Sequence, residues 1–111
     1  MNEKTETYLL HIKENIEKIE ELITEIKQYE DYSSKEKENT RLAVERCLTI
    51  IGEAVIRIKK TEEKEILKNT KEIIGFRNLL IHAYDGVDDA MVWLILINHL
   101  PKLRTEIENI K

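Results

Sequence analysis

The sequence predicts an all-α protein, specifically an antiparallel bundle of four to five helices that forms a single domain over residues 1–111. Its composition supports this fold class, because only three glycines and one proline occur among 111 residues and 36% of the residues are charged. A β-fold requires more turn residues than this. Apolar side chains also recur every three or four positions along most of the chain, which is the period of an amphipathic helix.

The first predicted helix covers about residues 3 to 29. Its apolar positions alternate steps of three and four, with glutamate and lysine on the other faces. These positions are Leu9, Ile12, Ile16, Ile19, Ile23 and Ile26. The polar stretch YEDYSSKEKEN then predicts a break, in which Ser33 and Glu36 form a capping box that begins the next helix.

The second predicted helix should be buried on a broad face, because its apolar stripe is widened by further aliphatic side chains. The stripe contains Thr40, Val44, Cys47, Ile51, Ala54 and Ile58. After it, Thr61 followed by Glu62 and Glu63 predicts a cap with acids at the positive end of a new, short helical turn.

The third main helix is predicted from about Thr70 to Ala83, and Gly86 ends it. Asp88 is the expected N-cap of the segment VDDAMVWLILINHL, which is apolar on nearly all sides. Such a helix is buried from several directions, so it forms either the centre of the bundle or part of an oligomer interface. Pro101 then kinks the chain or starts a last helical turn.

Charge and cysteine content exclude several classes of protein. The net charge is -4 and the pI is about 5.5, so any RNA must be bound by a local basic site. The single cysteine, Cys47, lies in an apolar run and is expected to be buried. No secretory signal or bilayer-spanning stretch is present, so we expect a cytoplasmic protein. No ligand spacing indicates a metal or another cofactor.

The stretch GFRNLLIHAYDG places polar groups on one side of the third helix. With Arg77 at zero on a helical wheel, Tyr84 falls at about -20°, Asn78 at about 100° and His82 at about 140°. Gly75 lies beside His82 and leaves the backbone unshielded there. The opposite, apolar side should anchor the helix, and it contains Ile73, Phe76, Leu79, Leu80 and Ala83.

These groups suit metal-independent cleavage of RNA. Arg77 is a permanent cation that can grip a phosphate, and His82 can take the proton of a ribose 2'-OH near neutral pH. Asn78, one turn before His82, can orient the imidazole or bind phosphate. The spacing alone also fits an arginine in an ion pair and a histidine that caps a helix or lies on the surface.

The order Arg-x4-His-x-Tyr, formed by Arg77, His82 and Tyr84, resembles the motif of HEPN-domain proteins and specifically of the HepT-like RNase toxins. IIGEAVIRI, residues 50–58, is similar to a helical segment of that family. YDGVDDAMVWLILINHLPKL, residues 84–103, is similar to the segment that follows the family's motif. The likeness therefore extends over most of the chain.

The resemblance implies a homodimer in which two motifs form a composite cleft, and a metal-independent endoribonuclease in which Arg77 and His82 carry the chemistry. It also implies the toxin of a type VII toxin-antitoxin system. Its partner would be an MntA-like nucleotidyltransferase antitoxin that attaches AMP to Tyr84. Because Tyr84 shares its face with Arg77, the added phosphates would bring negative charge to the place where RNA phosphate must bind.

A second hypothesis is a non-catalytic helical dimer that binds a nucleotide or docks a nucleotidyltransferase. The acidic charge balance of the chain favours it. Arg46, Glu53 and Arg57 lie roughly along one stripe of the second helix, with Glu53 and Arg57 spaced for an ion pair. They can line the cleft and contact RNA, or form a solvated stripe of salt bridges.

Overall fold

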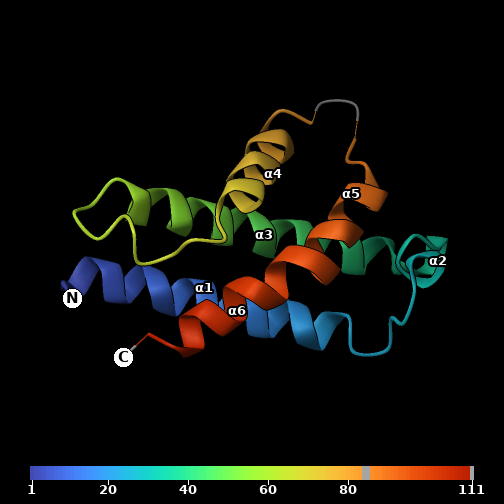
Figure 1. The fold of residues 1–111 in the computed structure, drawn as a ribbon. Coiled ribbons are helices and arrows are strands. Elements are labelled where there is room, and N and C mark those ends of the chain that lie inside the picture. Colours follow the sequence, from blue (N-terminus) through green and yellow to red (C-terminus); the bar gives the residue numbers. More distant parts are fainter. Residues whose placement is uncertain (84–85, 111) are drawn as a thin grey trace.

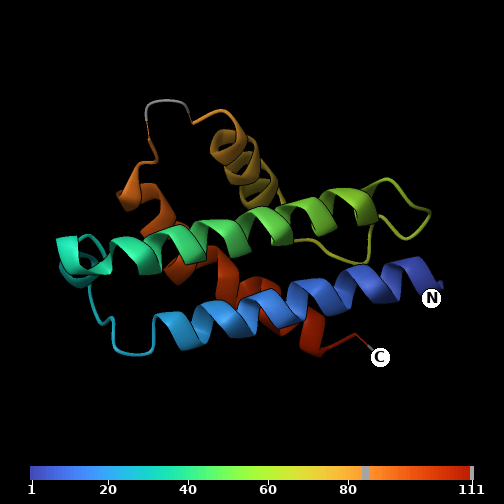
Figure 2. The same ribbon diagram turned by 180° about the vertical axis from the view of Figure 1, so that it is seen from behind.

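The computed structural model describes residues 1–83 and 86–110, and all regular elements within these residues are helical. Two long helices, α1 (Glu3–Leu22) and α3 (Glu38–Lys59), run antiparallel and side by side (Figures 1 and 2). The short α2 (Tyr29–Tyr32) and the 3-10 turn η1 (Lys35–Lys37) join them. The predicted all-α fold class is therefore confirmed.

The rest of the chain packs across this pair. Helix α4 (Lys71–Ile81) rises from α3, and α5 (Asp89–Leu94), the π-helical η2 (Ile95–His99) and α6 (Leu100–Glu108) form a nearly continuous rod (Figure 1). This rod passes over α1 and α3, so its inner side chains complete the core with those of the two long helices. No helix among the described residues is long and apolar enough to cross a membrane.

Helix α1 begins as its sequence predicts but ends earlier. The Asn2 side chain accepts a hydrogen bond from the Thr5 N–H at 2.8 Å, which caps the helix. The predicted extension to residue 29 is wrong, because the chain turns after Leu22 and the Asp31 carboxylate accepts from the Lys27 N–H. Ile26 still reaches the core, because this turn folds it back.

The predicted capping box at Ser33 and Glu36 is also wrong. The Ser33 hydroxyl donates to the Glu30 carbonyl, and α3 starts only at Glu38. Arg41 instead organises this corner by donating to the carbonyls of Tyr32 at 2.9 Å and Ser34 at 2.5 Å. A long side chain from inside α3 therefore replaces the local cap.

A carboxylate from α6 fixes the start of α4. Glu106 accepts hydrogen bonds from the backbone N–H groups of Lys68 and Asn69, both at 2.8 Å. Before this point, the Thr61 hydroxyl accepts from the Glu63 N–H as predicted, although the segment that follows forms turns and not a helix. The end of the loop between α3 and α4 is thus hydrogen-bonded to α6, and this contact helps to set the direction of α4 relative to α3.

The end of α4 and the start of α5 differ in part from expectation. Helix α4 ends at Ile81 with His82 as its C-cap, so the predicted end at Ala83 is two residues too late. Gly86 has a φ of 105°, which favours glycine, and the Asp88 side chain accepts from the Ala90 N–H at 3.0 Å, confirming the predicted N-cap.

Pro101 explains the π-helical segment in front of α6. Proline has no N–H to donate to the carbonyl four residues earlier, and its ring clashes with that carbonyl. Within η2 the Leu100 N–H bonds to the carbonyl of Ile95, five residues back, so the extra residue widens the turn where proline enters. The predicted disturbance at Pro101 is therefore a π turn within one rod.

The apolar segment after the motif is buried on one side only. Val92, Ile95 and Leu96 belong to the core, but Met91 and Leu94 are 43% and 52% exposed. Leu79, predicted on the anchoring side of α4, is 55% exposed and lies near them. The predicted burial from several directions is therefore wrong for the single chain, which presents an open apolar surface formed by α4 and α5.

Candidate functional site

Arg77 lies where α4 packs most closely on α3. A Cβ atom built on Gly52 of α3 would overlap the Arg77 Cβ and lie 2.6 Å from its Cγ. The stem of Arg77 therefore rests directly on the bare backbone of Gly52. Because the arginine faces α3, this side of α4 is a helix contact and not the open polar front that the wheel predicts.

The guanidinium of Arg77 is held by two neighbours. Its Nη2 forms an ion pair with the Glu53 carboxylate, and its Nη1 donates to the Asn78 side-chain oxygen at 3.0 Å. Its Nε is buried and has no hydrogen-bond partner among the described residues, while the side chain as a whole is 21% exposed. Arg77 is thus a fixed cation with a partly accessible edge.

His82 lies on the solvent side at the end of α4. Its backbone N–H bonds to the Leu79 carbonyl at 3.2 Å, and its side chain is exposed. Five residues separate it from Arg77, which corresponds to about 7.5 Å along a helix axis and about 140° around it. In one chain, the guanidinium lies against α3 while the His82 side chain is exposed beside α5, so the two groups lie on different sides of α4.

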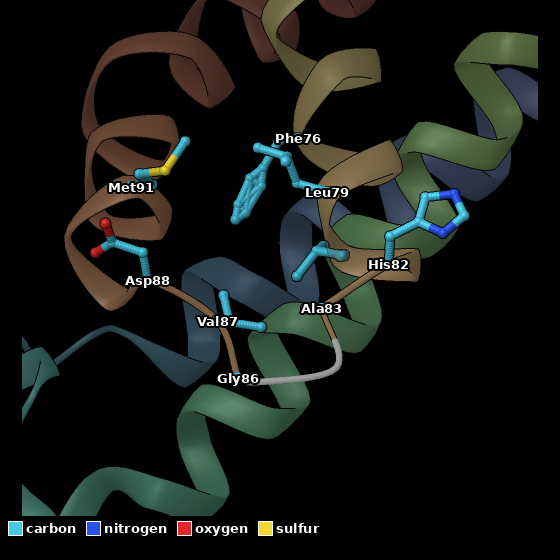
Figure 3. A pocket seen from close by; sticks show the side chains of 9 residues that line it. Phe76, Leu79, His82, Ala83, Gly86, Val87, Asp88 and Met91 are labelled. Atoms are coloured by element: carbon cyan, nitrogen blue, oxygen red, sulfur yellow. The ribbon is translucent and has the colours of Figure 1, made fainter.

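A cavity of about 220 Å³ opens beside His82, between α4 and α5. Phe76 from α4 and Met91 from α5 face each other across it, and the His82 ring extends away from them at the rim (Figure 3). Asp88 lies on the α5 side. The cavity is mainly apolar and merges with the exposed surface that contains Leu79.

The motif tyrosine, Tyr84, lies outside the described residues, as does Asp85. The described residues resume at Gly86. At the start of α5, Asp89 forms an ion pair with Arg41 of α3 at 3.5 Å. Burial, followed by the charge of Asp89, raises the pKa of the Glu45 carboxyl beside this pair. The segment after the motif is therefore anchored on α3 by a partly buried group of charges.

Sequence reasoning missed the roles of Gly52 and Glu53. It paired Glu53 with Arg57 at the i, i+4 spacing, whereas the structure pairs Glu53 with Arg77. A usable signal was present, because a glycine inside a long helix lowers stability and often marks a close approach of another backbone. Gly52 is buried in the middle of α3, which fits that role.

No group of three or more histidine, cysteine, aspartate or glutamate side chains in the described parts of the chain could hold a metal ion. Cys47 is buried in α3 as predicted, and burial raises the pKa of its thiol, which disfavours the reactive thiolate. Among the described residues, Arg77, Asn78, Glu53 and His82 are polar groups at the motif that can take part in chemistry.

Comparison with known proteins identifies the family to which this chain belongs. The family described as Ribonuclease HepT-like matches residues 12–110, which is nearly the whole chain. The chain belongs to the HepT-like family. No solved structure matches it.

Similar proteins carry names that describe them as probable or putative ribonucleases. "Probable ribonuclease HepT" of Thermococcus cleftensis is 38% identical over 114 residues. The aligned region covers 100% of this chain and 99% of that protein. "Putative RNase TTE0752" of Caldanaerobacter subterraneus is 38% identical over 104 residues, covering 93% of this chain and 90% of that protein. "Putative RNase MJ1380" of Methanocaldococcus jannaschii is 43% identical over 70 residues, with 61% of this chain matched to 63% of that protein's length.

The two glycines of α3 and α4 give a matched stability test. Gly52→Ala is expected to destabilise the protein by about 1–3 kcal/mol, because the new methyl group overlaps the stem of Arg77 and forces α4 away from α3. Gly75→Ala is expected to stabilise it by about 0.5–1 kcal/mol, because a Cβ there meets nothing within 4 Å and alanine favours the helix. Urea denaturation of both variants measures these changes.

Equal stabilisation by the two substitutions would contradict the close packing of Arg77 on Gly52. Both variants gain the same helix propensity, so the difference between them isolates the steric term at α3.

Proposed function

We propose that this protein is an endoribonuclease that cleaves RNA without a metal ion, using Arg77 and His82. The observation that carries the proposal is the way Arg77 is held: its stem is fixed on Gly52, and Glu53 and Asn78 fix its guanidinium. A cation held before substrate arrives needs no reorganisation when charge develops on the reacting phosphate. The names of the HepT-like relatives as ribonucleases support the same activity.

In the proposed reaction, the neutral imidazole of His82 removes the proton of a ribose 2'-OH. The 2'-oxygen then forms a bond to the adjacent phosphorus, and the bond from phosphorus to the 5'-oxygen breaks. Arg77 stabilises the negative charge on the phosphoryl oxygens, and the departing 5'-oxygen takes a proton from an imidazolium or from water. The products are a 2',3'-cyclic phosphate and a 5'-hydroxyl.

We further propose that two chains form the active unit. Leu79, Met91 and Leu94 expose large apolar areas on α4 and α5, and exposed apolar patches of this kind mark interaction sites. Pairing through this surface would bring two copies of His82 near each other and form a composite cleft.

The proposed biological role is the toxin of a type VII toxin-antitoxin system. In this proposal an MntA-like nucleotidyltransferase antitoxin attaches AMP to Tyr84, two residues after His82 and seven after Arg77 in the sequence. Phosphates on this hydroxyl would bring negative charge toward the Arg77 cation and occupy the place of the RNA phosphate.

A second candidate is a helical dimer that binds a nucleotide or docks a nucleotidyltransferase without cleaving RNA. The observation that favours it is the ion pair between Glu53 and Arg77, because the carboxylate offsets the charge that an RNA phosphate would otherwise meet. The net charge of -4 acts in the same direction. This candidate predicts tight binding without RNA turnover.

Cleavage of RNA in EDTA distinguishes the two candidates. The parent protein is expected to cleave single-stranded RNA with EDTA present, and His82→Ala and Arg77→Ala are each expected to lose about 10²- to 10⁴-fold in rate. His11→Ala is a matched control, because His11 is exposed on α1 and lies outside the motif. Unchanged cleavage by both motif variants would exclude the proposed catalytic residues.

The oligomeric state tests the proposed apolar interface. Leu94→Asp is expected to convert a dimer into monomers in sedimentation experiments, because it places a charge in the centre of a buried apolar surface. Leu42→Asp is the control, since Leu42 is similarly exposed at 57% but lies on α3. A dimer that survives Leu94→Asp and dissociates with Leu42→Asp would assign the interface to α3 instead.

Intact-mass measurement tests the proposed modification. Co-expression with a neighbouring nucleotidyltransferase is expected to add one or more AMP-sized increments to the parent protein and none to Tyr84→Phe. Tyr29→Phe, which changes a tyrosine in α2, should keep the increments. An active transferase that leaves the parent mass unchanged would contradict the modification while leaving the RNase proposal open to its own assay.

A further inference from the structure

The structure brings three arginines to one stripe of the α3 surface. Arg46, Glu53 and Arg57 fall within about 40° of one another around the helix, and this sector lies on the opposite side from the core-facing residues. Arg46 and Arg57 both lie on this outward-facing sector, and Arg57 is exposed. Arg77 belongs to α4, but its ion pair with Glu53 carries its guanidinium to this same stripe.

The stripe is locally basic although the whole chain is acidic. The Glu53 carboxylate pairs with Arg77, and Arg57 forms no ion pair with Glu53 among the described residues. Arg46 has no acidic residue three or four positions away on α3, where Leu42, Ala43, Thr49 and Ile50 lie. Neither arginine takes part in an ion pair within the described parts of the chain, so two cations without a carboxylate partner there flank the Arg77–Glu53 pair.

Their spacing suits a linear polyanion. Glu53 and Arg57 are separated by about 6 Å along the helix axis, and Arg46 and Glu53 by about 10 Å. Long arginine side chains can adjust to neighbouring phosphates over such distances. No aromatic side chain lies on this stripe, so stacking of bases would contribute little there, and charge would dominate the interaction.

We propose that Arg46 and Arg57 bind the phosphates of single-stranded RNA on either side of the phosphate held by Arg77. This inference rests on the proposed ribonuclease function and adds the path of the substrate: the strand runs along α3, with the reacting phosphate at Arg77. Backbone contacts of this kind carry no sequence information, so they provide affinity and register on the protein without choosing a base.

Salt-dependent binding tests this path. The probe is a short, labelled single-stranded RNA, and His82→Ala serves as the background so that the probe survives the titration. Removing one arginine that binds a phosphate should reduce the slope of log K against log salt concentration by about 0.7. Arg46→Ala and Arg57→Ala should each show this reduction and several-fold weaker binding at low salt, and the double variant should show about twice the reduction.

Two controls separate the proposed contacts from general charge effects. Arg104→Ala removes one positive charge from α6, where Arg104 pairs with Glu20 at 2.9 Å, and should leave the slope unchanged. Arg46→Lys and Arg57→Lys keep the charge and should keep the slope of the background protein. A reduction that is equal in Arg104→Ala would show only the effect of net charge and would overturn the assignment.

Other outcomes distinguish this inference from the proposed function. If the protein with His82 intact cleaves RNA but the Arg46/Arg57 double variant keeps the full salt slope, the path is wrong and the RNase function stands. If the slope falls as expected but the parent does not cleave RNA in EDTA, the path stands and the catalytic proposal fails. Tighter binding of polyglutamate than of RNA, abolished in the double variant, would assign the stripe to an acidic protein partner and overturn the inference.

Discussion

The candidate site depends on the contact between the stem of Arg77 and the backbone of Gly52. Any larger residue at position 52 would hold α4 away from α3, and the guanidinium would no longer reach Glu53. Because Asn78 accepts from the same guanidinium, the contact also fixes the first polar neighbour of Arg77 along the motif. The close packing of α4 on α3 therefore also sets the orientation of the Arg77 guanidinium, the proposed catalytic cation.

Sequence periodicity predicted those parts of the fold in which local preference and burial agree. The apolar stripe of α3 and the N-cap at Asp88 are examples, because each depends on residues only a few positions apart. Predictions failed where a group from another element intervened: Arg41, from inside α3, donates to the carbonyls of Tyr32 and Ser34 in place of the expected capping box. These contacts have no signature in local spacing.

The same limit applies to the candidate site. The motif gave Arg77, Asn78 and His82 as a set on one helix, yet the pairing of Arg77 with Glu53 joins two helices and replaces the expected Glu53–Arg57 pair. The wheel placed Arg77 and His82 on different sides of the helix, but it could not show that Arg77 faces α3. Position on a helix follows from sequence, whereas the neighbour across the contact follows from packing.

The central claim is that the cation fixed at Gly52 binds the reacting RNA phosphate. Titration of a protein labelled with 15N-arginine and 15N-histidine tests this claim by NMR. The ligand is a single-stranded RNA that carries 2'-deoxyribose and so cannot be cleaved. We expect the Arg77 Nε–H resonance to shift with the same dissociation constant as the His82 imidazole resonances. Saturation of the protein with RNA while the Arg77 resonance remains unchanged would contradict the account.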